Sequence, residues 1–339
     1  MTRPGRALRV GVIGVGRIGL FHLETLLSLD DVASVVVTDA DAEHGARVAA
    51  AHGVEAVESP EALVESGVDA FVVATPTPEH APMLRLAAAA GIPAFCEKPV
   101  ALEVAALDDV IETVRAAGIP VQVGFQRRFD AGYRAARDAV ATGRTGKVLA
   151  VRAATHDPAP PAEGYIARSG GIFRDLHIHD FDAIRFVTGD EVTEVYADGS
   201  VREAEWFARH GDVDTAAAVL RLGSGALAIL TGTRFDPRGY DVRLEVFGTR
   251  DSLAVGLDSR SPLRSVESDG PDPRGNGYRN FLDRFADAYR AELATFVECV
   301  REGRPSVCSL EEARAALVVA LAADRSRAER RPVAIAEVG

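Results

Sequence analysis

The stretch "LRVGVIGVGRIG" (residues 8–19) decides the fold of the first part of the chain. An apolar run typical of a buried strand leads into Gly14, Gly16 and Gly19, and a helical pattern over residues 19–29 follows. This context predicts that Gly14 permits a tight turn, Gly16 lets a pyrophosphate approach the backbone, and Gly19 lets helix and strand pack closely. The free amides at the start of the helix would then face the phosphates of a dinucleotide.

Outward from this motif, short apolar runs alternate with helical patterns of similar length as far as residue 126. This alternation is typical of βαβ units in a parallel sheet. The runs are apolar throughout, which fits a sheet covered on both faces. We therefore predict an α/β protein whose N-terminal domain, residues 1–126, is a Rossmann doubly wound parallel sheet that binds a dinucleotide.

The rhythm changes after residue 127, where strands follow one another across short turns. This pattern predicts a second α/β domain, residues 127–308, with a mainly antiparallel sheet. Its role in substrate binding and oligomerisation is implied by the family resemblance given below. Residues 309–339 are expected to form a C-terminal helix and tail that pack back on the Rossmann domain. We expect a Pro-rich loop at residues 157–171 and one helical stretch at residues 171–189.

A further polar stretch, residues 258–277, has neither helical nor strand period and is expected to be a loop. The length of 339 residues exceeds what one core usually supports, in agreement with two domains. The net charge of −12 argues against nucleic acid and anionic membranes as partners. The three cysteines lack CxxC spacing and a histidine cluster, so we expect no disulfide and no metal site. With no leader-like or transmembrane-length apolar run, we expect a cytoplasmic protein with a small-molecule substrate.

Asp39 lies twenty residues past Gly19, at the end of the second predicted strand. A carboxylate at this position accepts hydrogen bonds from the adenosine ribose diol and would repel a 2′-phosphate. No Arg or Lys directly follows it, so the sequence favours NAD over NADP. The structural alternative for Asp39 is a simple turn or helix-cap residue.

Ligands of open α/β sheets bind outside the carboxyl ends of the strands. By this rule Ala74, Thr75 and Pro76 should border the cofactor, and Lys98 should project toward the nicotinamide. Lys98 is one of only two lysines, with Lys147, in a chain whose other basic side chains are arginines, and lysine can take part in proton transfer. The predicted cofactor set is completed by Arg17, Ile18, His80 and Glu97.

The segment "GGIFRDLHIHDFD" contains a second candidate group. Asp175 and His179 are four residues apart, which on a helix puts both side chains on one face, with Asp182 one turn further along and His177 pointing elsewhere. Histidine is the usual general base near neutral pH, and a carboxylate one turn away can orient it. For such a pair alone, an ion pair or cap on the helix surface is the stronger interpretation.

Five stretches, "GVIGVGRIG", "VVATPTPEHAP", "EKPV", "GFQRRFDAGY" and "SGGIFRDLHIHDFD", together resemble the glucose–fructose oxidoreductase / inositol dehydrogenase / MocA family. The resemblance covers nearly the whole chain and is greatest to bacterial inositol 2-dehydrogenases. It implies a Rossmann domain, a second domain with an open, mainly antiparallel sheet, and a homotetramer. It also implies a catalytic set that falls here on Lys98, Asp175 and His179.

The resemblance further places Gln126 beside the nicotinamide, where relatives often carry Met. Substrate hydroxyls would be met by these catalytic residues and by Arg127, His156, Asp157 and Tyr240. The implied reaction oxidises a secondary hydroxyl of a cyclic polyol, myo-inositol or scyllo-inositol, to an inosose, with hydride passing to nicotinamide C4 and His179 as general base. The alternatives are an NAD(P)-dependent sugar or anhydrosugar dehydrogenase or reductase, an NAD-dependent glycoside-cleaving enzyme, and a nucleotide sensor without catalysis.

Overall fold

The computed structural model describes residues 6–269 and 277–339. The chain divides into two compact units, the first formed by residues 1–126 and 287–314 and the second by residues 127–286 and 315–339. The sequence analysis places one boundary at the same point, between residues 126 and 127, but residues 287–308, which it assigns to the second domain, belong to the first unit. Residues 270–276 of the predicted polar loop lie outside the described residues.

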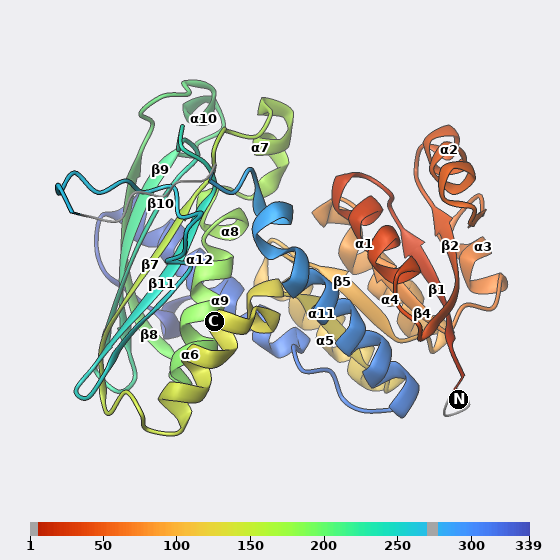
Figure 1. The fold of residues 1–339 in the computed structure, drawn as a ribbon. Helices are drawn as coiled ribbons and strands as arrows, with labels where there is room; N and C mark the ends of the chain where they lie inside the picture. Colours follow the sequence, from red (N-terminus) through yellow and green to blue (C-terminus); the bar gives the residue numbers. More distant parts are fainter. Residues whose placement is uncertain (1–5, 270–276) are drawn as a thin grey trace. The chain divides into compact units, whose positions relative to one another are not determined.

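The first unit is built on a parallel sheet of six strands in the order β3-β2-β1-β4-β5-β6 (Figure 1). All its pairings are parallel, and β1, β4, β5 and β6 are almost wholly buried, which confirms the predicted Rossmann sheet. The chain order reverses between β1 and β4, the place where such sheets bind dinucleotides. The strands are β1 (Leu8–Ile13), β2 (Val32–Thr38), β3 (Glu55–Ala56), β4 (Ala70–Val73), β5 (Ala94–Glu97) and β6 (Val121–Gly124).

Helices cover this sheet, as continuous apolar strands require. Leu293, Phe296 and Val300 of α11 pack into the same core as Leu23 of α1 and Val10 of β1. The helices of the first unit are α1 (Arg17–Leu27), α2 (Ala42–His52), α3 (Pro60–Glu65), α4 (His80–Ala90), α5 (Val104–Ala117) and most of α11 (Phe281–Glu302), with a short 3-10 turn, η1 (Thr77–Glu79).

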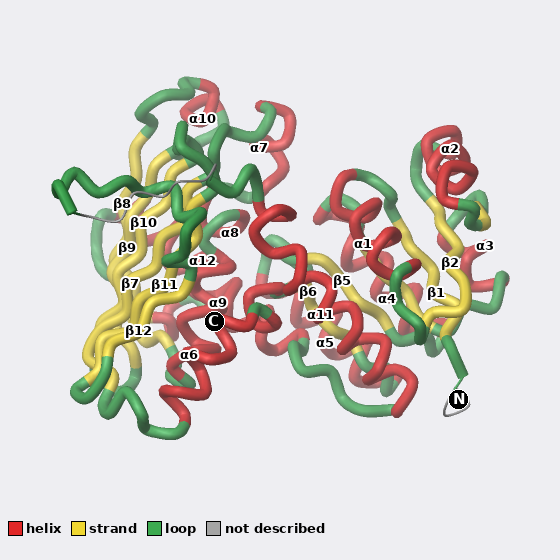
Figure 2. Tube along the Cα trace, in the orientation of Figure 1, coloured by secondary structure: helices red, strands yellow, loops and turns green. Residues whose placement is uncertain are grey.

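The second unit contains a seven-stranded sheet in the order β12-β11-β7-β10-β9-β8-β13 (Figure 2). Its pairings are antiparallel except for β7 with β10, which run parallel, so the predicted mainly antiparallel sheet is confirmed. The strands are β7 (Val148–His156), β8 (Val192–Ser200), β9 (Thr215–Leu222), β10 (Leu227–Thr233), β11 (Asp241–Gly248), β12 (Ser252–Val255) and β13 (Val333–Ala334).

Burial alternates along β9 and β10, because helices cover only one face of this sheet. Figure 1 shows α6, α8 and α9 on that face. The helices of the second unit are α6 (Ala131–Ala141), α7 (Glu163–Ser169), α8 (Ile172–Asp175), α9 (Ile178–Thr188), α10 (Trp206–Arg209) and most of α12 (Leu310–Glu329), with 3-10 turns η2 (Gln126–Phe129) and η3 (Ile335–Glu337). No helix within the described residues has the length and apolarity of a membrane span.

Two local predictions differ from the structure. The expected loop at residues 157–171 contains α7, and the expected single helix at residues 171–189 is divided into α8 and α9. The division falls at Leu176 and His177, where the His177 amide donates to Ile172 instead of continuing the regular helical pattern.

The prediction that residues 309–339 pack back on the Rossmann domain is wrong for most of this segment. Residues 315–339 belong to the second unit, where β13 pairs antiparallel with β8. Ser326 reinforces this attachment, because its hydroxyl accepts a hydrogen bond from the Ala197 amide and donates one to the Arg331 carbonyl. The physical reason is that the tail covers a sheet edge whose backbone groups would otherwise be unpaired.

Candidate active site

The glycine motif has the geometry that its spacing predicts. Gly14 has a φ of 87°, and a Cβ there would lie 2.9 Å from the Ala74 carbonyl oxygen. A Cβ on Gly19 would lie 1.9 Å from the Gly14 carbonyl oxygen, so the close contact of helix and turn requires glycine. Gly16 is the N-cap of α1, and a Cβ on it would meet no atom within 4 Å. Open space therefore lies beside the helix N-terminus, which fits a pyrophosphate group.

Asp39 holds the glycine loop in place. Its carboxylate accepts hydrogen bonds from the Val15 amide at 2.8 Å and the Asp41 amide at 2.9 Å. The cap of α2 is Asp41, whose side chain accepts from the His44 amide. Asp39 is thus a turn residue and not the cap, and it remains half-buried. Its contact with a ribose diol stays a prediction.

His80 supports the segments after β4 and β5, where the cofactor is predicted to bind. Its ring is buried, with Nδ1 2.8 Å from the Pro99 carbonyl oxygen and Nε2 2.8 Å from the Thr75 carbonyl oxygen. Burial lowers the pKa of His80, and a neutral imidazole donates only one hydrogen bond at a time. We expected a cofactor contact here, but the ring has almost no exposed surface. The structure instead assigns His80 to linking the segments that follow β4 and β5.

Glu97 is buried and supports the backbone, whereas the neighbouring Lys98 is partly exposed. The buried Glu97 carboxylate lies 2.7 Å from Nε2 of His22 on α1 and accepts a hydrogen bond from the Lys98 amide at 3.3 Å. Glu97 therefore anchors the backbone at Lys98, and its contact with the cofactor stays a prediction. Lys98 itself is partly exposed, and its peptide bond to Pro99 is cis.

Oε1 of Gln126 and Oγ1 of Thr75 are among the buried polar atoms of this unit that have no hydrogen-bond partner within the described residues. Buried polar groups are normally hydrogen-bonded, so both atoms fit a polar ligand. The remaining predicted cofactor residues lie along the same strand ends and the start of α1: Ala74 is buried, Pro76 and Arg17 are exposed, and Ile18 is half-buried. These residues fit a dinucleotide.

In the second unit, Asp175 is the last residue of α8, and the structure fixes both of its oxygens. The Tyr165 hydroxyl donates to Oδ1 at 2.7 Å, and Nη2 of Arg234 donates to Oδ2 at 2.7 Å. The helix itself is positioned by Asp212, whose carboxylate accepts the Ile172 amide at 2.9 Å. Asp175 is thus a positioned carboxylate and not a surface cap.

His179 lies in the first turn of α9 and is partly exposed. Of the other residues of its segment, Asp182 differs from the prediction and His177 agrees with it. Asp182 is buried and binds the Arg128 guanidinium through both oxygens, so it does not extend a shared polar face. His177 turns inward, where Nδ1 lies 2.8 Å from Asp180. The pairing of Asp175 with His179 stays a prediction.

Arg127 was expected to meet substrate hydroxyls, but only 2% of it is exposed. Its guanidinium pairs with Asp180 and donates to the Thr155 hydroxyl at 2.9 Å. Burial alone would raise the pKa of Asp180, but Arg127 and the bond to His177 outweigh it and lower the pKa to about 2. The pair with Asp180 holds the Arg127 guanidinium in place, and its contact with substrate hydroxyls stays a prediction.

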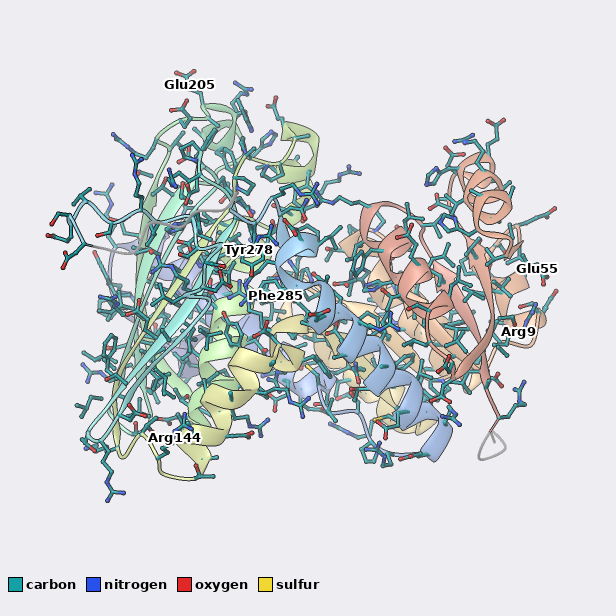
Figure 3. All side chains as sticks on the ribbon, viewed as in Figure 1. Arg9, Glu55, Arg144, Glu205, Tyr278 and Phe285 are labelled. Carbon is teal, nitrogen blue, oxygen red and sulfur yellow. The ribbon has the colours of Figure 1, made fainter. Side chains whose placement is uncertain are left out.

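Asp157 and Tyr240 also lie in the second unit. The half-buried Asp157 carboxylate accepts from Nη1 of Arg234 at 2.8 Å. Tyr240 is buried, its ring centroid lies 6.5 Å from that of Phe285, and its amide donates to the Tyr278 carbonyl; Figure 3 labels the latter two residues. Burial raises the pKa of Tyr240, which keeps its hydroxyl protonated. Contacts of both residues with substrate stay predictions.

Known proteins resemble this chain over its full length. A profile described as the oxidoreductase family with an NAD-binding Rossmann fold matches residues 8–125, and one for the GFO/IDH/MocA C-terminal domain matches residues 133–254. The myo-inositol 2-dehydrogenase of Thermotoga maritima is 40% identical over 98% of this chain and 99% of its own. The chain belongs to the GFO/IDH/MocA family.

Other family members agree with this result. The inositol 2-dehydrogenase of Rhizobium meliloti is 36% identical over 97% of this chain and 99% of that protein. The crystal structure of a probable dehydrogenase from Thermotoga maritima matches with a TM-score of 0.92 and 39% identity, covering 98% of this chain and 100% of the other. The Lactobacillus casei scyllo-inositol dehydrogenase with NAD(H) and scyllo-inositol matches with a TM-score of 0.88 and 27% identity over the same shares.

Within the GFO/IDH/MocA family, the prediction of an NAD-dependent oxidoreductase acting on CH–OH groups is confirmed, and so is NAD as its cofactor. The residues present fit that cofactor, because the space at Gly16 and the unpartnered atoms of Thr75 and Gln126 lie in the unit that matches the NAD-binding profile.

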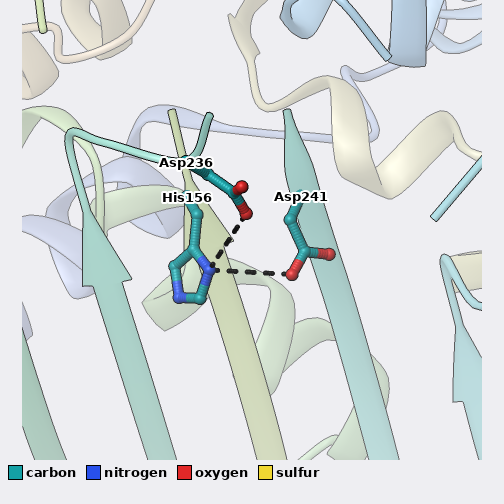
Figure 4. Close-up of side chains that lie close together, drawn as sticks. All are labelled: His156, Asp236 and Asp241. Atoms are coloured by element: carbon teal, nitrogen blue, oxygen red, sulfur yellow. Dashed lines mark ion pairs between the residues drawn. The ribbon is translucent and has the colours of Figure 1, made fainter. Parts of the chain in front are cut away.

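His156 lies at the end of β7, in a cluster with Asp236 and Asp241 (Figure 4). Its Nδ1 is 4.0 Å from the first carboxylate and 3.6 Å from the second. Burial lowers the pKa of His156, although both carboxylates act to raise it. Ligand atoms of the three residues lie within 4.8 Å of one another, but Arg243 already donates to both oxygens of Asp241. We therefore interpret the cluster as an ion-pair network and not as a metal site.

Sequence reasoning missed three residues that hold the predicted site: His22, Tyr165 and Arg234. Each is the partner of a predicted carboxylate. His22 and Arg234 are far from their partners in the sequence, and Tyr165 comes from a segment expected to be a loop. A histidine within the apolar face of α1, and an arginine directly after the apolar strand β10, are the signals that could have found two of them.

Proposed function

We propose that the protein oxidises a secondary hydroxyl of an uncharged cyclic polyol, myo-inositol or scyllo-inositol, to the corresponding inosose. The observation that carries this proposal is the similarity, over 98% of this chain, to a protein named myo-inositol 2-dehydrogenase. A Bacillus subtilis relative, 36% identical over 96% of this chain, is named scyllo-inositol 2-dehydrogenase (NAD(+)), so the similarity supports both isomers.

The proposed mechanism assigns one step to each residue of the Lys98, Asp175 and His179 set. An imidazole nitrogen of His179 accepts the proton of the substrate hydroxyl, while hydride leaves the carbon that bears this hydroxyl. Asp175 stabilises the imidazolium that forms, and Lys98 donates a hydrogen bond to the reacting oxygen as negative charge develops there. NAD, when bound, supplies the nicotinamide C4 that takes up the hydride. Backbone amides at Gly14 and Gly16 and the Asp39 carboxylate would hold the dinucleotide.

The charge around Asp175 supports an uncharged substrate. Asp157 and Asp175 share the single guanidinium of Arg234, and the amide of the neighbouring Asp236 donates to the Asp157 carbonyl. The carboxylates of this group therefore outnumber its cation. A phosphate or carboxylate on the substrate would meet repulsion there, whereas hydroxyl groups can donate to these oxygens.

A substrate panel followed at the NADH absorbance tests the proposal. We expect turnover with myo-inositol or scyllo-inositol, less with glucose, and none with inositol phosphate or glucuronate. Turnover confined to glucose or an anhydrosugar would overturn the proposed substrate in favour of a sugar dehydrogenase. Cleavage of a glycoside without net NADH release would overturn the reaction as well.

We also propose that the protein is a cytoplasmic homotetramer. The face of the second sheet opposite its helices carries exposed apolar side chains, which sit on neighbouring strands: Tyr196, Val219, Leu227 and Ile229, each 40–44% exposed. Such a patch suits contact with a second copy. The three cysteines are free and buried, which suits a reducing compartment. Light scattering on the purified protein measures the assembly, and a monomeric mass would exclude it.

A further inference from the structure

We propose that Arg234 is a positioning residue of the reaction, which holds the Asp175 carboxylate in one orientation. This inference rests on the proposed function, in which Asp175 stabilises the protonated His179. Arg234 lies outside the Lys98, Asp175 and His179 set, and no predicted motif contains it.

The sheet topology brings Arg234 to the site. Strands β7 and β10 are adjacent and parallel, so their carboxyl ends lie at the same edge of the sheet. Asp157 directly follows β7 and Arg234 directly follows β10. Their backbones are also fixed, because the Asp157 amide donates to the Thr233 carbonyl at 2.9 Å and the Arg234 amide to the Asp214 carbonyl at 2.8 Å.

The guanidinium of Arg234 is shared between two carboxylates. Nη2 donates to Asp175 at 2.7 Å and Nη1 to Asp157 at 2.8 Å, while only 3% of the arginine is exposed. A planar guanidinium presents its nitrogens in a fixed fork, so the position of one carboxylate sets the direction of the bond to the other. A lysine carries its three N–H donors on one nitrogen, so it does not hold two carboxylates in the fixed geometry of this fork.

Tyr165 completes the arrangement from the opposite side of the carboxylate. Its hydroxyl bonds Oδ1 of Asp175 while Arg234 bonds Oδ2, so rotation of the carboxylate would break both bonds. Tyr165 is 47% exposed and comes from α7, which is tied to α10 by the ion pair of Glu163 with Arg209 at 2.9 Å. The short helix that sequence analysis expected to be loop is therefore part of the support of Asp175.

The chemical consequence concerns the step in which His179 gains a proton. A carboxylate that stabilises an imidazolium must carry its charge and point an oxygen in a constant direction. Burial works against that charge, and a buried carboxylate left without its cation is strongly destabilised. Arg234 offsets this burial cost at Asp175, and the bond from Tyr165 fixes the direction.

The test compares Arg234→Met, Arg234→Lys and Tyr165→Phe with the unaltered protein, using the best polyol of the substrate panel. Arg234→Met should lower kcat roughly 10- to 100-fold, the size of a lost hydrogen bond to a charged group, with a smaller rise in KM. Arg234→Lys should recover part of kcat, because it restores the charge but not the bridge. Tyr165→Phe, at a half-exposed site, should lower kcat about fivefold. NAD affinity, followed by fluorescence titration, should not change.

Arg185→Met is the matched control. Arg185 is also a buried arginine that holds a carboxylate with two nitrogens, at 2.6 and 2.8 Å, but its partner is Glu191 at the far end of α9. It should lose stability and keep its kcat. If Arg234→Met and Tyr165→Phe both keep kcat per folded molecule, Arg234 has only a structural role and the inference is wrong. If the unaltered protein oxidises no polyol, the proposed function fails instead, and the same variants are assayed on whichever substrate is turned over.

Discussion

The two units of this protein build their functional residues in different ways. In the first unit, the glycine turn, Asp39 and Lys98 are placed by backbone geometry at the ends of parallel strands, within short motifs. In the second unit, Asp175 and its segment are held by side-chain pairs between residues far apart in the chain. Arg234 is 59 residues from Asp175, and Arg128 is 54 residues from Asp182.

This difference predicts how each unit responds to substitution. A site placed by backbone turns tolerates most side-chain changes but not an added Cβ where the backbone must pass closely. A site placed by buried ion pairs tolerates backbone variation but loses its geometry when one partner is removed. The following predictions test this contrast, beginning with the largest effect.

His179→Ala should impair catalysis, which depends on the second unit, and leave NAD binding by the first unit intact. A general base contributes about 10²- to 10⁴-fold to the rate, so kcat should fall by that factor. The residues predicted to bind the dinucleotide lie in the first unit, so NAD affinity should stay within about twofold. This change is smaller than the effect of losing one hydrogen bond. Steady-state kinetics and fluorescence titration measure the two quantities. A collapse of NAD affinity with kcat retained would contradict both the role of His179 and the contrast between the units.

Asp324→Asn should reveal a buried pair of the second unit through its pH dependence. Asp324 lies 3.0 Å from Arg174, the neighbour of Asp175, and burial raises its pKa to about 6 despite Arg174 and Arg327. A carboxyl whose folded pKa is raised favours the folded state fully below about pH 4 and loses that contribution as pH rises through 6. Relative to the variant, the unaltered protein should therefore lose roughly 2 to 3 kcal/mol of unfolding free energy across this window.

Urea unfolding at several pH values from 4 to 7.5 measures this loss. Asp31→Asn is the control, because that carboxylate pairs with Arg301 at a half-exposed position of the first unit. It should change the pH dependence little, since exposed pairs contribute about 0–1 kcal/mol. An equal pH dependence of the unfolding free energy for the unaltered protein and Asp324→Asn would show that burial does not raise the pKa of Asp324.

The contrast also explains how much could be predicted from the sequence. The Rossmann sheet, the glycine turn and the second, mainly antiparallel sheet follow from periodicity and spacing, which are local properties. The roles of His80 and Glu97 could not be predicted, because a motif places a residue near a site without saying whether its side chain faces the ligand or the support. Both face inward, to backbone carbonyls and to His22 respectively.

Long-range pairing accounts for the other differences. Arg127 is a plausible substrate contact by position, and only the buried Asp180 shows that its charge is already paired. The tail at residues 315–339 was placed on the wrong unit, because a two-residue strand such as β13 has no sequence signal of its own. Arg234 was also missed because its pairing is long-range, and nothing near it in sequence identifies Asp175 as its partner.

Gly16→Ala carries the smallest expected effect and tests the first unit alone. Gly16 has an extended conformation that alanine can adopt, and its Cβ would meet no atom of the protein within 4 Å. Because alanine is a poorer N-cap than glycine, stability without NAD should fall by about 1 kcal/mol or less. The added methyl occupies the space predicted for the pyrophosphate, so NAD affinity should fall about tenfold, the size of one lost hydrogen bond to a charged group. Gly164→Ala on α7 also places a Cβ in open space, in the second unit, and should leave NAD affinity unchanged. Fluorescence titration with NAD measures all three proteins, and an unchanged affinity for Gly16→Ala would mean that the dinucleotide does not approach this turn.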